Sequence, residues 1–339
     1  MDDSAGCDSA ARHCFRRMPI MRTFPFAATL VVVALVAGGC ETNPSTGRSQ
    51  FIVISPEETA QMGEQAKPEM IKEYGGEVKS PELRRYIEQV GRRLSRHVED
   101  EFKGTNWEFI TLDSDVINAF ALPGGKVFMS RGLLQQLDSE AGVAGVLGHE
   151  IGHVTARHVD ERISHSMLVQ GLVSVGGAVV GGEGLAQLIP TVIGGVGQGY
   201  LLKFSRDQES EADRQGLKYM TRSGYDPMGM ADVMKVLIAA SEGNEQWEIL
   251  STHPDPKKRL EDILHGIEKD YAETQHNPKY RKFENRFERG ALPYLPARTR
   301  RASLGAVIDH PELWCAHCRQ AAGLAVPLAI ARADSNSIE

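Results

Sequence analysis

The sequence of 339 residues lacks an excess of positive charge, because 38 lysines and arginines face 45 aspartates and glutamates. The formal net charge of −7 argues against a general affinity for nucleic acid. Residues 279–301 are locally basic, and we interpret them as a solvated surface or tail rather than as a docking site. The hydrophobic content of 41% and the charged content of 24% are typical of a folded globular protein, so a disordered or fibrous chain is excluded too.

Apolar runs long enough to cross a membrane are also lacking. The run at residues 24–37 is shorter than the roughly 20 residues that a spanning helix needs. Residues 167–202 are apolar and rich in glycine, but Gly182, Glu183 and Pro190 interrupt them. We expect this segment to form a pair of buried helices packed over its neighbours, with a membrane-contacting hairpin as the alternative.

The N-terminal region has the pattern of a secretory signal, with a short basic start, an apolar run, small residues and then Cys40. It resembles the signals of bacterial lipoproteins, which are cleaved before a cysteine whose thiol carries lipid, although Ala37 stands where Leu or Val is more usual. We therefore expect residues 1–39 to be a signal peptide, with Met21 as an alternative start. Residues 40–50 are expected to be a lipid-anchored tether.

The C-terminal region, residues 276–339, is expected to be a basic and partly disordered extension. Cys315 and Cys318 form a CxxC pair within it. A zinc site needs two further ligands, and a c-type haem site needs a histidine where Arg319 stands. We interpret the pair as having no function, with a metal or redox site as the alternative.

Between these ends the pattern predicts helices around a small sheet. Ser55, Pro56 and Glu58 are typical of a capped helix start. A second helix is predicted from Pro81 by apolar residues on one face, namely Leu83, Ile87, Val90 and Leu94. Residues 107–137 alternate apolar and polar side chains around a Pro-Gly-Gly turn, which predicts two antiparallel strands and a helix. The expected fold class is a predominantly helical α+β fold with a small antiparallel or mixed sheet beside the next helix.

That next helix contains two histidines four residues apart with a glutamate after the first. His149 and His153 lie about 40° apart in helical projection, so both imidazoles can converge on one ion, with Glu150 beside them. A specified HExxH pattern arises by chance on the order of once in a hundred chains of this length. A zinc site is therefore favoured over two histidines of a helical core.

Four glycines, Gly142, Gly145, Gly148 and Gly152, cluster beside the two histidines. Each costs a helix about 1 kcal/mol relative to alanine. Their number predicts that another backbone packs closely against this face.

A catalytic zinc ion takes three protein ligands and leaves one position for water, so a third ligand is needed. Ser205 and Gln208 predict a capping box that starts a helix, and Glu209 and Asp213 share one face of it. The first carboxylate could bind zinc and the second could hold the distal N–H of a ligand histidine. Glu211 points about 200° away from Glu209, and an acidic pair that is merely solvated is the alternative.

The segments HEIGHVTARH, SRDQESEADRQG, STHPDPKKR, NAFALPGGKVFMSRGLL and SGYDPMGM together resemble the gluzincin metallopeptidase family of the CAAX prenyl proteases and the beta-barrel assembly-enhancing proteases. The resemblance covers residues 42–267. It implies a zincin-like metallopeptidase core, placed at residues 51–275, with one catalytic Zn²⁺ ion. It further implies that His149, His153 and Glu209 are zinc ligands, that Glu150 is the general base, and that Asp213 matches the acidic residue of the motif.

The resemblance also assigns two neighbouring regions. His253 matches the histidine of the family's HP motif, which either stabilises the oxyanion or caps the zinc in a latent state. Asp255 and Pro256 look like the N-cap and first residue of a helix after it. The family's edge strand, on which an extended substrate adds backbone hydrogen bonds, corresponds to Asn118, Ala119, Phe120, Ala121 and Leu122.

These observations predict a zinc-dependent endopeptidase in quality control of the bacterial cell envelope, acting on unfolded or misassembled envelope proteins. We expect a periplasmic protein held at the inner or outer membrane by the lipid anchor on Cys40, with no nucleic acid partner and no organic cofactor. Two alternatives stay open. One is a chaperone-like lipoprotein with structural or capped zinc, and the other is a redox or metal-handling protein that uses Cys315 and Cys318.

Overall fold

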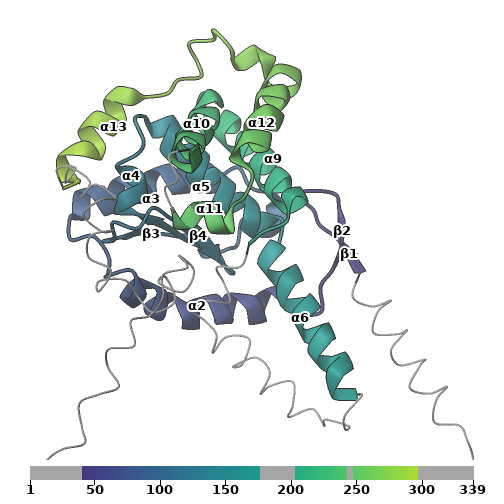
Figure 1. Ribbon diagram of the computed structural model, residues 1–339. Coiled ribbons are helices and arrows are strands. Elements are labelled where there is room, and N and C mark those ends of the chain that lie inside the picture. Colours follow the sequence, from purple (N-terminus) through teal and green to yellow (C-terminus); the bar gives the residue numbers. More distant parts are fainter. Residues whose placement is uncertain (1–39, 176–202, 243–246, 297–339) are drawn as a thin grey trace, which may run out of the picture.

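The computed structural model describes residues 40–175, 203–242 and 247–296 (Figure 1). The expected signal peptide, most of the interrupted apolar segment and the CxxC pair lie outside these residues. The helices are α2 (Pro56–Glu73), α3 (Pro81–Ser95), α4 (Arg131–Leu134), α5 (Glu140–Thr155), α6 (His158–Val175), α9 (Arg206–Arg222), α10 (Met228–Glu242), α11 (Glu248–Thr252), α12 (Pro256–Asp270) and α13 (Glu284–Gly290). The strands are β1 (Cys40–Thr42), β2 (Ser49–Phe51), β3 (Glu108–Leu112), β4 (Ala119–Leu122) and β5 (Lys126–Ser130). The predicted α+β class with a helical majority is confirmed.

The central sheet has three strands in the order β3-β5-β4. Strands β4 and β5 form the predicted antiparallel hairpin, and Gly124 and Gly125 take the positive φ angles of +74° and +82° that its turn requires. Strand β3 pairs with β5 in parallel, so the sheet is mixed. Strand β4 therefore lies at an edge of the sheet.

Helices cover both faces of this sheet (Figure 1). Side chains alternate between the faces along each strand, so Ile110 and Phe128 pack with Met70 of α2, whereas Phe109 and Val127 belong to the core that α3 and α5 form. The four apolar residues predicted for the face of α3 are all buried, and the predicted capping box at the start of α2 is present. One face of the sheet thus packs against α5.

Helix α5 is enclosed on all sides, since Val154 is its one residue that is not buried. A Cβ atom on Gly152 would lie 2.6 Å from the backbone oxygen of Ala212, and one on Gly148 would lie 3.3 Å from the Cα of Gly216, both in α9. A Cβ atom on Gly145 would similarly meet the backbone of Met230 in α10 at 3.0 Å. The predicted close backbone is therefore that of α9 and α10.

The folded region extends beyond both boundaries expected for the domain. Strands β1 and β2 pair into a hairpin within residues 40–51, and its Asn43 and Gln50 amides donate to the carbonyl oxygens of Thr155 and Ala156 at 3.0 and 2.7 Å. Residues 40–50 are therefore fixed to the end of α5 instead of forming a tether. Beyond residue 275, α13 buries Phe287 completely in the main core, so the extension contributes structure that composition alone does not indicate.

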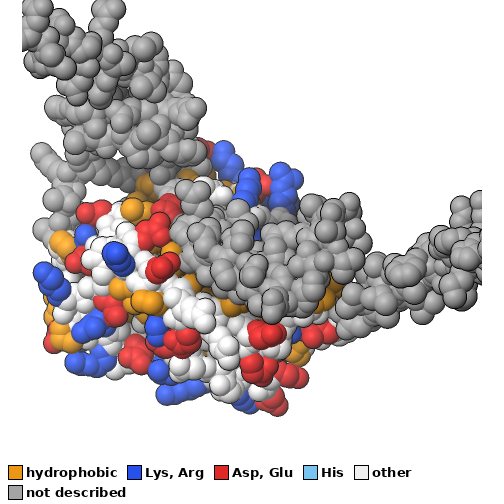
Figure 2. Space-filling model, turned by 90° about the horizontal axis from the view of Figure 1, so that it is seen from below, with side chains coloured by type: hydrophobic (Ala, Val, Ile, Leu, Met, Phe, Trp, Pro, Cys, Tyr) orange, Lys and Arg blue, Asp and Glu red, His pale blue; other side chains and the backbone are white. Residues whose placement is uncertain are grey.

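The surface carries charge of both signs. On the face seen from the α2 side, acidic and basic side chains are interspersed around scattered hydrophobic ones (Figure 2). Within the described parts of the chain, no helix combines the length and apolar character that crossing a membrane requires.

Candidate metal centre

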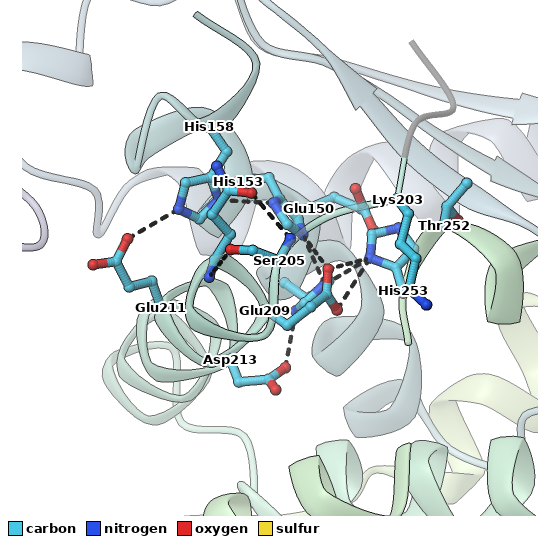
Figure 3. A network of polar contacts seen from close by, with 12 residues as sticks. Glu150, His153, His158, Lys203, Ser205, Glu209, Glu211, Asp213, Thr252 and His253 are labelled. Atoms are coloured by element: carbon cyan, nitrogen blue, oxygen red, sulfur yellow. Dashed lines mark hydrogen bonds and ion pairs between the residues drawn. The ribbon is translucent and has the colours of Figure 1, made fainter. Parts of the chain in front are cut away.

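Three elements bring four predicted residues together in the interior. His149 and His153 come from α5. Glu209 comes from the first turn of α9, and His253 is the residue directly after α11; His153, Glu209 and His253 are labelled in Figure 3. One nitrogen or oxygen atom from each of the four lies within 4.8 Å of the others, and all four side chains are buried. The capping box of Ser205 and Gln208, which was predicted from sequence, fixes the start of α9 and thereby the place of Glu209.

The spacing of these atoms fits one metal ion. The His149 Nε2 atom lies 3.0 Å from His153 Nε2 and 3.6 Å from Glu209 Oε2, and His153 Nε2 lies 3.4 Å from Glu209 Oε1. A tetrahedral zinc ion with ligands about 2.0–2.2 Å away holds them about 3.3–3.6 Å from one another. His253 Nδ1 is similarly placed, 3.0 Å from Glu209 Oε1 and 3.2 Å from His149 Nε2.

The charges of the buried groups also suit a cation. Burial holds the pKa of His153 well below its usual range, which keeps the imidazole in the neutral form that binds metal. Burial would raise the pKa of Glu209, but the positive charges of His253 and Arg259 outweigh it and hold that pKa well below its usual range. Three carboxylates, those of Glu150, Glu209 and Asp213, act electrostatically on the buried guanidinium of Arg259. A cation bound among them would offset part of their negative charge.

His149 is held by the predicted carboxylate and by an arginine that the sequence reasoning did not assign. Asp213 Oδ1 lies 2.9 Å from His149 Nδ1, on the side of the ring away from the cluster. Arg259 donates to both Asp213 oxygens at 2.8 and 2.6 Å and contacts Glu209 Oε2 at 2.6 Å. A signal for Arg259 existed: it ends a basic run in the first turn of α12, where the helix dipole disfavours positive charge.

His153 has a different support, which the sequence reasoning also missed. Its Nδ1 atom lies 2.9 Å from Nδ1 of His158, and His158 Nε2 lies 3.0 Å from Glu211 Oε2 (Figure 3). Glu211 thus points away from Glu209, as the helical projection predicts, yet it is buried. Burial lowers the pKa of His158 even though Glu211 acts in the opposite direction.

His253 faces both the cluster and the glutamate of the HExxH sequence. Its Nε2 atom lies 3.7 Å from Glu150 Oε1. Burial raises the pKa of Glu150, and the Glu209 and Glu150 carboxylates raise the pKa of His253 although burial opposes them. Asp255 occupies the predicted N-cap position of α12 with a left-handed φ of 60°, but its side chain makes no capping hydrogen bond and pairs with Arg206 at 2.6 Å instead.

The predicted substrate strand lies beside this centre. Strand β4, with Ala119, Phe120, Ala121 and Leu122, is the sheet edge that packs against α5. Ala121 and Leu122 line a groove of about 1040 Å³ that reaches His153. The Asn118 side chain is turned inward and donates to Glu248 Oε1 at 2.8 Å, which ties the start of β4 to α11 and hence to His253.

Comparisons with known proteins all identify peptidases as similar to this chain. The model of peptidase family M48 matches residues 81–267. The chain is 33% identical over 255 residues to the beta-barrel assembly-enhancing protease of Escherichia coli. The aligned region covers 72% of this chain and 51% of that protein. It is 34% identical over 240 residues to the mitochondrial metalloendopeptidase OMA1 of Schizosaccharomyces pombe, covering 68% of this chain and 69% of the relative. The match therefore spans about half the length of the bacterial relative.

Proposed function

Because the chain belongs to peptidase family M48, we propose that it is a zinc-dependent endopeptidase in which His149, His153 and Glu209 hold one zinc ion. The observation that carries the proposal is the buried cluster of these residues, whose atom spacing and charge suit one divalent ion. The imidazole and carboxylate donor set is that of known catalytic zinc sites.

The chemistry follows from the residues around the cluster. A bound zinc ion supplies a Lewis acid that polarises the scissile carbonyl and acidifies a water molecule. Glu150 takes the proton of the attacking water and passes it to the leaving amine. The raised pKa of Glu150 suits both steps, because a group that first accepts a proton and then donates it works best when its pKa is close to the operating pH. The outer edge of β4, which pairs with no other strand of the described residues, would align an extended peptide by backbone hydrogen bonds.

The position of His253 supports a latent resting state. Its Nδ1 atom lies at hydrogen-bond distance from atoms of two proposed ligands, where a fourth ligand would stand. A fourth protein ligand would occupy the position that water needs. In this proposal His253 leaves the cluster before cleavage, whereas the alternative role in stabilising the oxyanion would need it to stay.

One experiment tests these assignments together: zinc per chain and casein cleavage in the parent, Glu150→Gln and His253→Ala proteins. Glu150→Gln should retain zinc and lose about 10²-fold or more of its activity. His253→Ala should cleave faster than the parent if the residue caps the site and more slowly if it stabilises the oxyanion. His265→Ala, an exposed histidine in α12, is the matched control. If the parent holds zinc and the Glu150→Gln variant keeps its full function, the chaperone-like alternative is indicated.

We further propose that the enzyme acts in the periplasm on unfolded or misassembled envelope proteins and is anchored by lipid on Cys40. The similarity to a beta-barrel assembly-enhancing protease supports the substrate class. The hairpin that begins at Cys40 is fixed to α5, so a lipid there would keep the proteolytic centre close to the membrane surface. Mass spectrometry of the mature N-terminus should find a lipid-modified cysteine, and Cys40→Ser should release the protein from membranes. An unmodified Cys40 in a fully active protein would contradict the anchor.

A further inference from the structure

We propose that His158 and Glu211 are positioning residues that fix the His153 imidazole for metal binding through a relay of hydrogen bonds. The relay runs from Glu211 on α9 to His158 at the start of α6 and then to His153 on α5 (Figure 3). The inference rests on the proposed function, in which His153 binds zinc through Nε2.

The hydrogen positions follow from that ligand atom. If Nε2 of His153 gives its lone pair to a metal, the neutral ring carries its proton on Nδ1. This N–H donates to the lone pair on His158 Nδ1, 2.9 Å away. His158 then carries its own proton on Nε2 and donates it to the Glu211 carboxylate at 3.0 Å. Each N–H donor of the relay therefore meets an acceptor, and the relay ends on the negative charge of Glu211.

The two ligand histidines are therefore held by carboxylates in different ways. His149 reaches Asp213 directly, whereas His153 reaches Glu211 through a second imidazole. In both cases the carboxylate stands on α9, the helix that also supplies Glu209. A partner of this kind fixes the orientation of a ligand ring and raises its basicity.

The backbone is shaped to bring His158 back toward His153. Along an uninterrupted helix, residues five apart would point about 140° apart. Here Arg157 takes a left-handed φ of 54° between the end of α5 and the start of α6, which turns the chain. This conformation is uncommon for a residue other than glycine, and it is held by Arg157 Nε donating to Asp160 at 2.8 Å. His158 is fully buried at its resulting position.

The far end of the relay is attached to the N-terminal hairpin. Arg48, between β1 and β2, donates from Nε to Glu211 at 2.9 Å. Its other two nitrogens form a paired contact with Glu161 of α6 at 2.8 and 2.7 Å. Arg48 therefore holds α6 and α9 together around His158, so the hairpin adjoining Cys40 helps to set the metal centre.

The test measures zinc affinity by competition with a chromophoric chelator, together with the visible spectrum of the cobalt-substituted protein. The variants are His158→Ala and Glu211→Gln, and the matched control is Glu99→Gln. Glu99 is a partly buried carboxylate that likewise joins the hairpin to α9, through Ser45 and Lys218, but it contacts neither ligand histidine. Glu211→Gln keeps the shape of the side chain, so it remains informative if His158→Ala does not fold.

His158→Ala should weaken zinc binding about 10–100-fold, the loss typical of removing such a partner. Glu211→Gln should give a smaller loss in the same direction, and the cobalt spectrum of both should change, while Glu99→Gln matches the parent. The ring of Phe204 also stacks on His153, with centroids 3.9 Å apart. If that stacking alone fixed the ligand, folded His158→Ala and Glu211→Gln proteins would bind zinc as tightly as the parent, and the relay would be refuted. A parent chain that binds no zinc would instead refute the proposed function.

Discussion

Replacing Gly152 by alanine should damage the metal centre through backbone packing alone. The new Cβ atom would lie 2.6 Å from the carbonyl oxygen of Ala212 and 3.0 Å from its Cα. Ordinary contacts begin at about 3.4 Å, so α5 and α9 would have to separate by roughly 0.8 Å. Helix α5 carries His149 and His153, and helix α9 carries Glu209, so the separation would move the proposed ligands apart.

The magnitude follows from two opposing effects. Overpacking of a tight interior costs about 1–3 kcal/mol, and alanine recovers about 1 kcal/mol of helix propensity relative to glycine. We therefore expect the free energy of unfolding to fall by up to about 2 kcal/mol. The effect on the metal should be larger, because ligand distances tolerate only about 0.2 Å. A tenfold or greater loss of zinc affinity is expected.

Gly142 in the same helix supplies the control. A Cβ atom there meets nothing closer than the Ser139 hydroxyl at 3.4 Å. Gly142→Ala should therefore stabilise the protein by up to about 1 kcal/mol and leave zinc binding unchanged. Denaturant unfolding and chelator competition measure both quantities. If Gly152→Ala were as stable as Gly142→Ala and bound zinc like the parent, the close contact of α5 with α9 would not be what places the ligands.

Removing zinc with a chelator should lower the unfolding temperature, since zinc at 100 times its dissociation constant stabilises the folded state by about 2.7 kcal/mol. Adding zinc back should restore the unfolding temperature of the parent. Equal restoration by magnesium would contradict the proposed ligand set. Burial raises the pKa of Glu99, but hydrogen bonds led by that from Lys218 outweigh it and lower this pKa. Its stabilisation is therefore complete above the ordinary pKa and lost on acidification, so the stability difference between the parent and Glu99→Gln should shrink from about pH 6 to about pH 3. A difference independent of pH would contradict that sign. Phe287→Ala should cost about 3–5 kcal/mol because the ring is fully buried, whereas Leu292→Ala, 46% exposed, should be nearly neutral. Equal effects of the two substitutions would mean that α13 is not part of the core.

Local patterns in the sequence predicted local structure well. The capping boxes at Ser55 and Ser205, the hairpin turn at the paired glycines and the buried face of α3 all depend on residues within a few positions of one another. The same holds for His149, Glu150 and His153, because helical periodicity alone places them side by side. The clustered glycines of α5 correctly predicted a close neighbour, although not which one.

The boundaries of the folded region could not be read in this way. Residues 40–50 are polar and Phe287 stands in a charged stretch, so composition indicated a tether and an extension. Their actual places depend on partners far along the chain, such as the carbonyl of Thr155 for Asn43. Such long-range pairing leaves no periodic signal in the segment itself.

Helical periodicity in the sequence places His149, Glu150 and His153 on one helix. The capped helix that follows supplied Glu209 as a candidate third ligand, and the resemblance to a known family added His253. The packed helices, in contrast, were needed to see that His253 Nδ1 points at the cluster, that Arg259 holds Glu209 and Asp213, and that the left-handed turn at Arg157 returns His158 to His153. Helical spacing fixes which side chains share a face, whereas the partners of a buried charge are set by the packing of whole helices against each other.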